Sequence, residues 1–315
     1  MSSEKAPSSS SLSTLGQPEA DGFSRPSSRS LLKVQEKASL LVEALPYIQR
    51  FAGERVVVKF GGHAMKSPQI QESFARDVTL LRSIGINVIV VHGGGPQINT
   101  LLNQLSVTSE FIEGMRVTDD ATMRAAQMAL IGEVNPMLVQ LINSAGGRSV
   151  GLSGVDGQLL QATRYRPNGV DIGRVGQVQR VNDSELRLLG DAGFIPVVAP
   201  IGIDTEHHET LNINADYAAS AIAEHMLARK LVLMTDVDAI LGAEGEPIST
   251  LTIDKARELL NHGVISGGMI PKLECAFEAL RSGVEKVHIV NGCLKHALLL
   301  ELFTDQGVGT ELVLE

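Results

Sequence analysis

Glycine runs that follow two short β-branched segments are the feature that most restricts how this chain can fold. The segment 55–60 leads into the glycines at 61–62, and the segment 88–92 leads into those at 93–95. An apolar strand that ends in glycines and opens a helix leaves backbone N–H groups free to hold an anion, above all phosphate. Two such turns, with Lys59 just before the first, predict an α/β fold that does chemistry on phosphate.

The two best-known glycine motifs for nucleotides are absent from the sequence. It contains neither G-x-x-x-x-G-K-S/T nor G-x-G-x-x-G. We therefore expect any nucleotide to be held without a Walker A loop and without the dinucleotide fingerprint. A nicotinamide-dependent dehydrogenase, one alternative for such a chain, is disfavoured for the same reason.

Composition further limits the classes of protein to which this chain can belong. A chain of 315 residues can bury a substantial core, and a net charge of -9 argues against a nucleic-acid or anionic-membrane partner. No apolar run approaches membrane-spanning length. Cys275 and Cys293 lack metal-site spacing, so we expect no disulfide framework, no metal site and a cytoplasmic location. Aromatic residues make up only 3%, which predicts an aliphatic core and suits a parallel sheet buried on both faces.

The N-terminal residues 1–30 differ from the rest of the chain. They are rich in serine and cannot bury enough apolar surface to order themselves, so we expect a disordered tail. A transit peptide is the alternative, because Arg25 and Arg29 lie among serines. Acidic residues such as Glu19 and Asp21 argue against it, since transit peptides are poor in acids.

A helix is expected at 31–50. Its apolar residues recur at steps of three and four, namely Val34, Ala38, Leu41, Leu45 and Ile48. Pro46 falls inside this stripe and should kink the helix. The first interpretation is that this apolar stripe packs on its own domain. Because the helix lies before the first strand of the sheet, the second interpretation is that the stripe packs against another subunit and serves oligomerisation.

From residue 55 onward, strand and helix patterns alternate. Helices are expected at 68–82, 96–105, 121–131, 134–144, 183–189, 214–225, 254–260, 269–282 and 295–303, and further strands at 150–152, 159–163, 195–198, 231–234, 287–290 and 311–314. This alternation predicts a three-layer α-β-α sandwich with a mainly parallel central sheet. A fresh strand-helix series begins near Arg229, which predicts two domains, 51–228 and 229–315.

Three basic residues lie at positions where they could bind an anion. Lys59 could point into solvent, but the glycines beside it favour a role on an anion. Lys272 lies early in a predicted helix, where it opposes the helix macrodipole, so we expect its partner to be an anion elsewhere. Arg116 lies in a loop, where an arginine is usually solvated or paired with a surface acid, and a carboxylate clamp is the alternative.

Other polar side chains leave several functions open. Asn214 is an ordinary N-cap, whereas Asn212 and Asp216 beside it are not explained by capping alone. Asp236 and Asp238 follow a strand and could bind ribose, a metal or only water.

Two histidine-containing segments have structural explanations. The segment 206–209 (Glu-His-His-Glu) looks like a metal cluster, but adjacent residues cannot all face one ion, so we expect a hydrated loop. His288 lies on an apolar strand, where a satisfied core histidine is the default.

The glycine and polar segments together resemble one known family. They occur in a fixed order, at 58–62, 92–95, 114–118, 211–216, 235–238 and 267–272. This ordered set resembles the N-acetyl-L-glutamate kinases of the amino-acid kinase superfamily, over residues 32–315. Arg116 in its Gly-Met-Arg-Val-Thr setting and the Asn-Ile-Asn-Ala-Asp segment point to the acetylglutamate branch.

The resemblance implies a reaction and its catalytic residues. The γ-phosphoryl group of ATP would pass to the side-chain carboxylate of N-acetyl-L-glutamate, the second step of L-arginine biosynthesis, with Mg²⁺ carried by ATP. Lys59 and Lys272 match the two lysines on either side of the transferring phosphoryl group, and Asp216 matches the acid that holds both. Gly62 and Gly94 match donors to phosphoryl oxygens.

The resemblance also implies binding residues for each substrate. Gly94, Gly95, Arg116 and Asn212 match the acetylglutamate contacts, with Arg116 and Asn212 on the α-carboxylate. The nucleotide-binding positions would be Thr235, Asp236, Val237, Asp238, Ala239, Ile240, Val264, Ile265 and Ser266.

The helix at 31–50 resembles that of arginine-inhibited members, which are hexamers joined through this helix. The resemblance implies an L-arginine site at His288, Glu301 and Gly307 in the domain at 229–315, which also binds ATP, with Tyr47 of the helix contributing. The domain at 51–228 would bind acetylglutamate and dimerise. Likeness to members from oxygenic phototrophs further implies a PII-type nitrogen-sensing protein as partner.

Two alternatives stay within the same fold. Glutamate 5-kinase or an aspartokinase would use the same lysines, but those relatives often carry regulatory domains, and this chain ends soon after Leu314. A non-catalytic arginine-sensing module is the other alternative, and the presence of Lys59, Lys272 and Asp216 argues against it.

Overall fold

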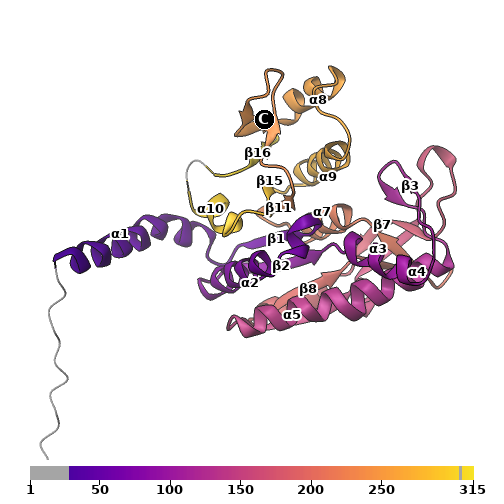
Figure 1. Ribbon diagram of the computed structural model, residues 1–315, viewed down its shortest axis with the longest axis horizontal. Helices are drawn as coiled ribbons and strands as arrows, with labels where there is room; N and C mark the ends of the chain where they lie inside the picture. The colour runs from indigo at the N-terminus through magenta and orange to yellow at the C-terminus, as the bar shows by residue number, and fades with distance from the viewer. Residues whose placement is uncertain (1–27, 305–306) are drawn as a thin grey trace, which may run out of the picture. The chain divides into compact units, whose positions relative to one another are not determined.

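The computed structural model describes the backbone of residues 28–304 and 307–315 (Figure 1). The chain divides at Glu43 and Ala44 into two units, and every element after the first helix lies in Ala44–Glu315. Helix α1, Ser28–Phe51, covers the helix expected at 31–50 and runs through Pro46. The tail expected at 1–30 lies outside the described residues, except for its last three. The division into domains at 228 and 229 stays a prediction.

An 8-stranded sheet forms the centre of the second unit. Its strand order is β14-β16-β15-β11-β1-β2-β8-β5. The bounds are Arg55–Phe60 for β1, Asn87–His92 for β2, Ser149–Ser153 for β5, Ile195–Ala199 for β8, Lys230–Thr235 for β11, Thr250–Thr252 for β14, Lys286–Asn291 for β15 and Thr310–Val313 for β16. All neighbours pair in parallel except β15 and β16. The expected mainly parallel sheet is confirmed.

Helices cover both faces of this sheet. On one face lie α2 (Pro68–Ser83), α5 (Asn135–Ser144) and α10 (Ala297–Phe303), and on the other lie α6 (Ser184–Asp191), α7 (Ala215–His225), α8 (Ile253–Asn261) and α9 (Met269–Arg281). Strand side chains alternate between the two faces, so Val57 packs into one hydrophobic core while Val56 and Val58 pack into the other. The three-layer α-β-α sandwich is therefore confirmed.

A smaller set of strands forms a closed barrel, β10-β7-β6-β9. Its strands are β6 (Leu160–Arg164), β7 (Val175–Val181), β9 (Ile201–Asp204) and β10 (Glu209–Ile213). Two short hairpins complete the strands, β3 (Phe111–Ile112) with β4 (Met115–Arg116), and β12 (Ile240–Leu241) with β13 (Pro247–Ile248). Of the barrel strands, only β6 follows from the sequence patterns, because β7 does not alternate apolar and polar residues regularly and β9 and β10 have only four and five residues.

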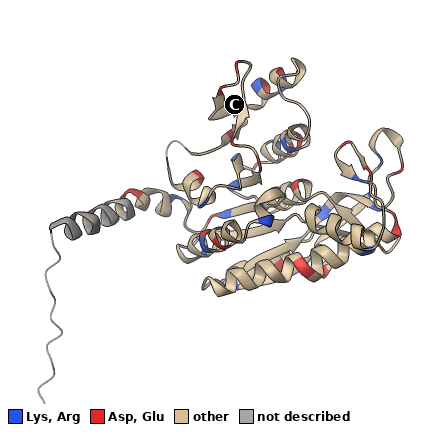
Figure 2. Ribbon diagram, viewed as in Figure 1, with Lys and Arg blue, Asp and Glu red and all other residues tan. Residues whose placement is uncertain are grey.

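The two helices expected at 121–131 and 134–144 are joined in the structure. Helix α4, Asp120–Gln127, passes through a π-helix, Met128–Val134, into α5. By length and composition the joined run Asp120–Ser144 is apolar enough to cross a membrane, which the sequence patterns did not predict. This is weak evidence for a membrane, because 44% of its most apolar stretch is buried inside the fold. Figure 2 shows acidic and basic residues scattered among the same helices and strands.

Candidate functional site

The two glycine turns lie side by side because their strands are neighbours in the sheet. Phe60 of β1 pairs with His92 of β2, and the Gly93 N–H donates to the Phe60 carbonyl at 2.8 Å. Gly62 has a φ of +69°, a conformation that L side chains rarely adopt. A Cβ on Gly94 would collide with the Leu130 side chain. Glycine is therefore required at both turns.

Lys59, Asp216 and Lys272 meet at the carboxyl ends of these strands. The Lys59 Nζ lies 3.0 Å from Asp216 Oδ1, and the Lys272 Nζ lies 2.6 Å from Asp216 Oδ2. Asp216 is held in the first turn of α7, where its N–H donates to the Asn214 side-chain oxygen at 2.8 Å. The anion expected for Lys272 is therefore Asp216.

Burial and mutual attraction set the charges of this trio. Burial works against the charge on Asp216, but the two ammonium groups outweigh it and lower the pKa of this carboxyl to about 2. Burial lowers the pKa of Lys59, an effect that Asp216 only partly offsets. For Lys272 the attraction of Asp216 outweighs burial and raises the pKa. The trio therefore keeps a fixed negative charge between two cations.

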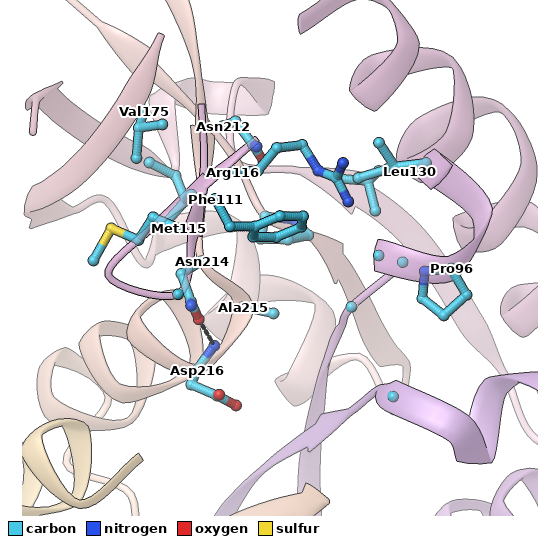
Figure 3. Close-up of a pocket in the computed structure, with 18 of the residues that line it drawn as sticks. Pro96, Phe111, Met115, Arg116, Leu130, Val175, Asn212, Asn214, Ala215 and Asp216 are labelled. Atoms are coloured by element: carbon cyan, nitrogen blue, oxygen red, sulfur yellow. Dashed lines mark hydrogen bonds between the residues drawn. The ribbon is translucent and has the colours of Figure 1, made fainter. Parts of the chain in front are cut away.

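A cavity of about 260 Å³ opens in front of the trio. Every catalytic and substrate-binding residue expected from the sequence lines it, apart from Lys272: Lys59, Gly62, Gly94, Gly95, Arg116, Asn212 and Asp216. Figure 3 shows Arg116 in the upper part of this cavity and Asp216 in the lower part. We call it the first cavity. Lys272 reaches Asp216 from α9, so it joins the site through that carboxylate.

Arg116 enters the first cavity from the β3-β4 hairpin. Glu113 and Gly114, with φ of 49° and 76°, form its turn, and both positive values are typical of a two-residue hairpin turn. Phe111 and Arg116 face each other across the hairpin, and the guanidinium carbon lies 4.6 Å from the Phe111 ring centroid. The hairpin therefore fixes Arg116, although a plain loop was expected here.

The Arg116 guanidinium is buried with neutral partners. It donates to Ser109 Oγ at 2.5 Å and to Asn99 Oδ1 at 2.7 Å, and no described carboxylate forms an ion pair with it. Burial lowers its pKa. The Asn212 amide nearby donates to the Thr118 hydroxyl at 3.2 Å. A buried cation without a counter-ion is suited to receive a carboxylate ligand.

A second opening, of about 460 Å³, gathers the residues expected to bind the nucleotide. Of the predicted set it is lined by Asp236, Val237, Asp238, Ala239, Ile240, Val264, Ile265 and Ser266. Thr235 is buried at the end of β11 and does not line it. We call this opening the nucleotide cavity, after the ligand that the sequence predicts for it. Its Asp236 lies 2.8 Å from His63, the residue after Gly62, and its Met269 begins the helix that carries Lys272.

A further cavity, of about 540 Å³, contains Tyr47, His288, Glu301 and Gly307, the residues expected to form an allosteric site. We call it the third cavity. His288 Nδ1 lies 2.6 Å from Glu301 Oε1, and Glu301 Oε2 accepts from the Val308 and Gly309 amides at 2.8 and 3.1 Å. His288 therefore has a buried acidic partner at Nδ1, but its Nε2 is buried without a hydrogen bond among the described residues, so the expected satisfied core histidine is only half satisfied.

The segment at 206–209 forms no metal cluster in the structure. His207 Nδ1 pairs with Asp204 at 3.0 Å across a turn, and Glu209 begins β10. Among the residues described, no group of three or more His, Cys, Asp and Glu side chains could hold a metal ion.

Comparisons with known proteins agree with this arrangement. The model of the amino acid kinase family matches residues 54–291. The acetylglutamate kinase of Syntrophus aciditrophicus is 52% identical over 292 residues, which cover 90% of this chain and 98% of that protein. The chain belongs to the acetylglutamate kinases of the amino acid kinase family. The member of this family from Syntrophobacter fumaroxidans is also 52% identical, over 88% of this chain and 96% of its own length.

Solved structures give the same fold. N-acetylglutamate synthase from Neisseria gonorrhoeae, complexed with coenzyme A and N-acetyl-glutamate, matches with a TM-score of 0.80 at 28% identity, over 88% of this chain and 63% of the synthase. Its complex with coenzyme A and L-arginine gives 0.77 at 27%, over 88% and 65%. Carbamate kinase from Giardia lamblia bound to AMP-PNP gives 0.64 at 16%, over 84% and 99%, and shows the fold alone.

Several residues of the site have no role in the sequence-based hypothesis. Asn99 and Ser109 hold Arg116, and Leu130 of the π-helix packs against Gly94. His92 lies within a quoted glycine motif but receives no function from it. The Glu113-Gly114 pair between apolar residues is the signal that could have revealed the hairpin.

Proposed function

We propose that this chain transfers the γ-phosphoryl group of ATP to the side-chain carboxylate of N-acetyl-L-glutamate, giving ADP and N-acetyl-L-glutamyl 5-phosphate. The reaction is the second step of L-arginine biosynthesis. The observation that carries the proposal is the first cavity, which has a buried, acid-free Arg116 on one side and the Lys59–Asp216–Lys272 trio on the other. Family membership supports the same reaction.

The trio supplies electrostatic stabilisation to the transferring group. Phosphoryl transfer involves little covalent work for the protein, so positioning and charge stabilisation dominate. Lys59 and Lys272 approach from different elements, β1 and α9, and Asp216 keeps both in place. The backbone N–H groups of Gly62 and Gly94 add donors in the same cavity.

Arg116 and Asn212 would bind the α-carboxylate of acetylglutamate. A carboxylate arriving beside Arg116 gives this buried guanidinium the counter-ion that the described chain does not provide. The side-chain carboxylate then points toward the lower part of the cavity, where Figure 3 shows Asp216 and where Asp216 pairs with Lys59. This orientation makes the γ-carboxylate the acceptor.

ATP would occupy the nucleotide cavity, with its γ-phosphate toward Lys272. Because no described cluster of carboxylates and histidines could hold a metal ion, we propose that Mg²⁺ arrives bound to the phosphates of ATP. Asp236 and Asp238 line this cavity, and their carboxylates would contact the water molecules bound to Mg²⁺. Mg²⁺ would neutralise charge between the phosphates.

An acceptor comparison tests the function. ADP release from ATP is measured with N-acetylglutamate, glutamate, aspartate and carbamate, and the acyl phosphate is trapped with hydroxylamine. We expect turnover with N-acetylglutamate and none with free glutamate. Equal or faster turnover of glutamate or aspartate would assign the chain to another branch of the fold, and no turnover with any acceptor would favour a non-catalytic module.

We also propose that L-arginine inhibits the enzyme by binding in the third cavity. The cavity presents Glu301 and Glu311 to a guanidinium, and Lys230 and Lys286 to a carboxylate. Burial lowers the pKa of Lys230 to about 8, so this side chain gains from a bound anion. The arginine complex of the related synthase supports a role for arginine in this fold.

Assembly and location are further proposals. We propose a cytoplasmic homo-hexamer, in which dimers join through α1. Light scattering after size-exclusion chromatography tests the oligomeric state. Association with a PII-type nitrogen-sensing protein rests on resemblance alone, and co-purification with such a protein tests it.

A further inference from the structure

We infer that His92 and Asn135 are positioning residues, which aim the Gly94 N–H into the first cavity by holding the preceding peptide. The inference rests on the proposed function for its kinetic test. Its structural basis is a chain of hydrogen bonds in which every donor and acceptor is fixed by its neighbour. His92 is fully buried, and Asn135 is 6% exposed.

Asn135 has its orientation set by backbone carbonyls. Its Nδ2 donates to the Val197 carbonyl at 2.8 Å and lies 3.3 Å from the Leu152 carbonyl. Carbonyl oxygens only accept hydrogen bonds, so the amide nitrogen, and not the amide oxygen, must face them. The amide oxygen points toward Gly151, where any side chain would collide with it.

The same amide nitrogen fixes the tautomer of His92. It lies 3.1 Å from His92 Nε2, and since it is a donor, Nε2 must be the unprotonated acceptor. The proton of the neutral ring is then on Nδ1. Burial lowers the pKa of His92 to about 4, so the ring is neutral at physiological pH.

The Nδ1 proton in turn fixes the peptide between Gly93 and Gly94. His92 Nδ1 lies 2.8 Å from the Gly93 carbonyl and donates to it. In a planar trans peptide the C=O and the following N–H point in opposite directions. Holding the carbonyl toward the buried ring therefore turns the Gly94 N–H away from it, toward the cavity that Gly94 lines.

The rest of the turn keeps this donor free. The Gly93 N–H is already used by the Phe60 carbonyl, whereas the Gly94 N–H has no acceptor in the described part of the chain. Glycines have no side chain to oppose a peptide flip, so the turn needs an outside restraint. His92 provides that restraint, and the donor is in place before substrate arrives.

Two isosteric variants of His92 test the inference. The amide nitrogen of an asparagine can take the place of Nδ1, whereas a glutamine amide reaches the Nε2 position, where its oxygen can accept from Asn135 and no donor is left for the Gly93 carbonyl. We expect H92Q to lower kcat for N-acetylglutamate about tenfold to a hundredfold, and H92N to keep most of the wild-type kcat. KM for both substrates should change little in either variant, because Arg116 and the nucleotide cavity are intact. Activity in H92Q equal to or above that in H92N would overturn the inference.

A neutron crystal structure tests the same chain without kinetics or variants. We expect deuterium on Nδ1 of His92 and none on Nε2 at neutral pH. Deuterium on Nε2 would overturn the inference even if the enzyme is active. The two failures are distinguishable, because a wild-type protein inactive on N-acetylglutamate refutes the proposed function, while the tautomer decides the positioning of Gly94.

Discussion

At the scale of single residues, the buried charged side chains of the first cavity differ in whether they have a partner of opposite charge. Asp216 lies between Lys59 and Lys272 and keeps its charge although it is buried. Arg116 is buried without an acidic partner among the described residues. Both lysines of the trio thus have an acidic partner within the chain while Arg116 has none among the described residues, and the two groups should respond differently to substitution.

Removing either lysine should slow the chemical step. We expect K59A and K272A each to lower kcat about a hundredfold, or roughly 3 kcal/mol, because each lysine acts mainly on charge that develops in the transition state. KM for N-acetylglutamate should change much less. K255A is the control, since Lys255 pairs with Glu258 on the exposed surface of α8. Steady-state kinetics with both substrates varied decides, and a pure KM effect would contradict the assignment.

Removing Arg116 should instead weaken substrate binding. We expect R116A to raise KM for N-acetylglutamate by much more than it lowers kcat, because the α-carboxylate keeps its charge throughout the transfer. KM for ATP should stay near the wild-type value. R187A serves as the control, since Arg187 forms an intrahelical pair with Asp183. An unchanged KM for N-acetylglutamate would remove Arg116 from the binding site.

His92 should make stability depend on pH. Burial lowers its pKa from 6.5 to about 4, so the unfolded state takes up a proton at a higher pH than the folded state. Its contribution is fully present above pH 6.5 and is lost as the pH falls toward 4, by about 3 kcal/mol in total. Urea unfolding between pH 7 and pH 4 measures this loss. The loss should be smaller by this amount in H92N, and an identical pH profile would contradict the burial of a neutral ring.

At the scale of elements, the parts of the site that could be predicted from the sequence are those that begin at a recognisable turn or helix cap. The two glycine turns and the N-cap Asn214 are local signals that the sequence patterns reveal, whereas the grouping of Lys59, Gly94 and Asp216 in one site is predicted from the family resemblance, and the three line one cavity. Strand β7 does not alternate apolar and polar residues regularly, and β9 and β10 have only four and five residues. Periodicity within such a segment is too brief to distinguish it from a loop.

The same limit applies to contacts between side chains. The approach of Asn135 to His92 depends on packing of α5 against β2, β5 and β8, and no spacing in the sequence encodes it. The approach of Phe111 to Arg116 does have a local cause, because the positive φ values at Glu113 and Gly114 bring the two side chains together across the hairpin. The hairpin was missed because this turn was not recognised.

The β3-β4 hairpin offers a prediction at this scale. We expect G114V to raise KM for N-acetylglutamate while kcat stays near wild type, because valine at a φ of 76° costs roughly 1–2 kcal/mol and disturbs the hairpin that carries Arg116. G190A is the control, since a Cβ on Gly190 meets nothing within 4 Å and Gly190 lies on α6, outside the first cavity. Unchanged kinetics in G114V would show that the turn does not position Arg116.

At the scale of the whole molecule, the third cavity and the nucleotide cavity lie at opposite ends of the same two strands of the sheet. Strand β15 begins at Lys286 in the third cavity and ends at Asn291 in the nucleotide cavity. Strand β11 likewise begins at Lys230 in the third cavity and ends at Thr235, next to the nucleotide cavity. We expect a ligand at the amino ends of these strands to act on the nucleotide cavity through the two buried strands.

The end of α1 makes this coupling testable by truncation. Tyr47, Arg50 and Phe51 line the third cavity, and the Tyr47 ring lies 6.4 Å from that of Phe303 in an edge-to-face arrangement. Deleting residues 1–50 removes Tyr47 and Arg50 from this wall but leaves the first cavity intact. We expect near-normal kcat, a dimer in place of the hexamer and a weak response to L-arginine.

Two further variants separate the wall of the cavity from the rest of the N-terminal segment. Deletion of residues 1–27 leaves α1 whole and should keep both the hexamer and the arginine response. Y47A should keep the hexamer but bind arginine more weakly, because it removes one side of the cavity and no strand or loop of the active site. Inhibition curves and light scattering on the same preparations give both readouts. A protein without residues 1–50 that stays hexameric and fully arginine-sensitive would place the inhibitor and the assembly contacts elsewhere.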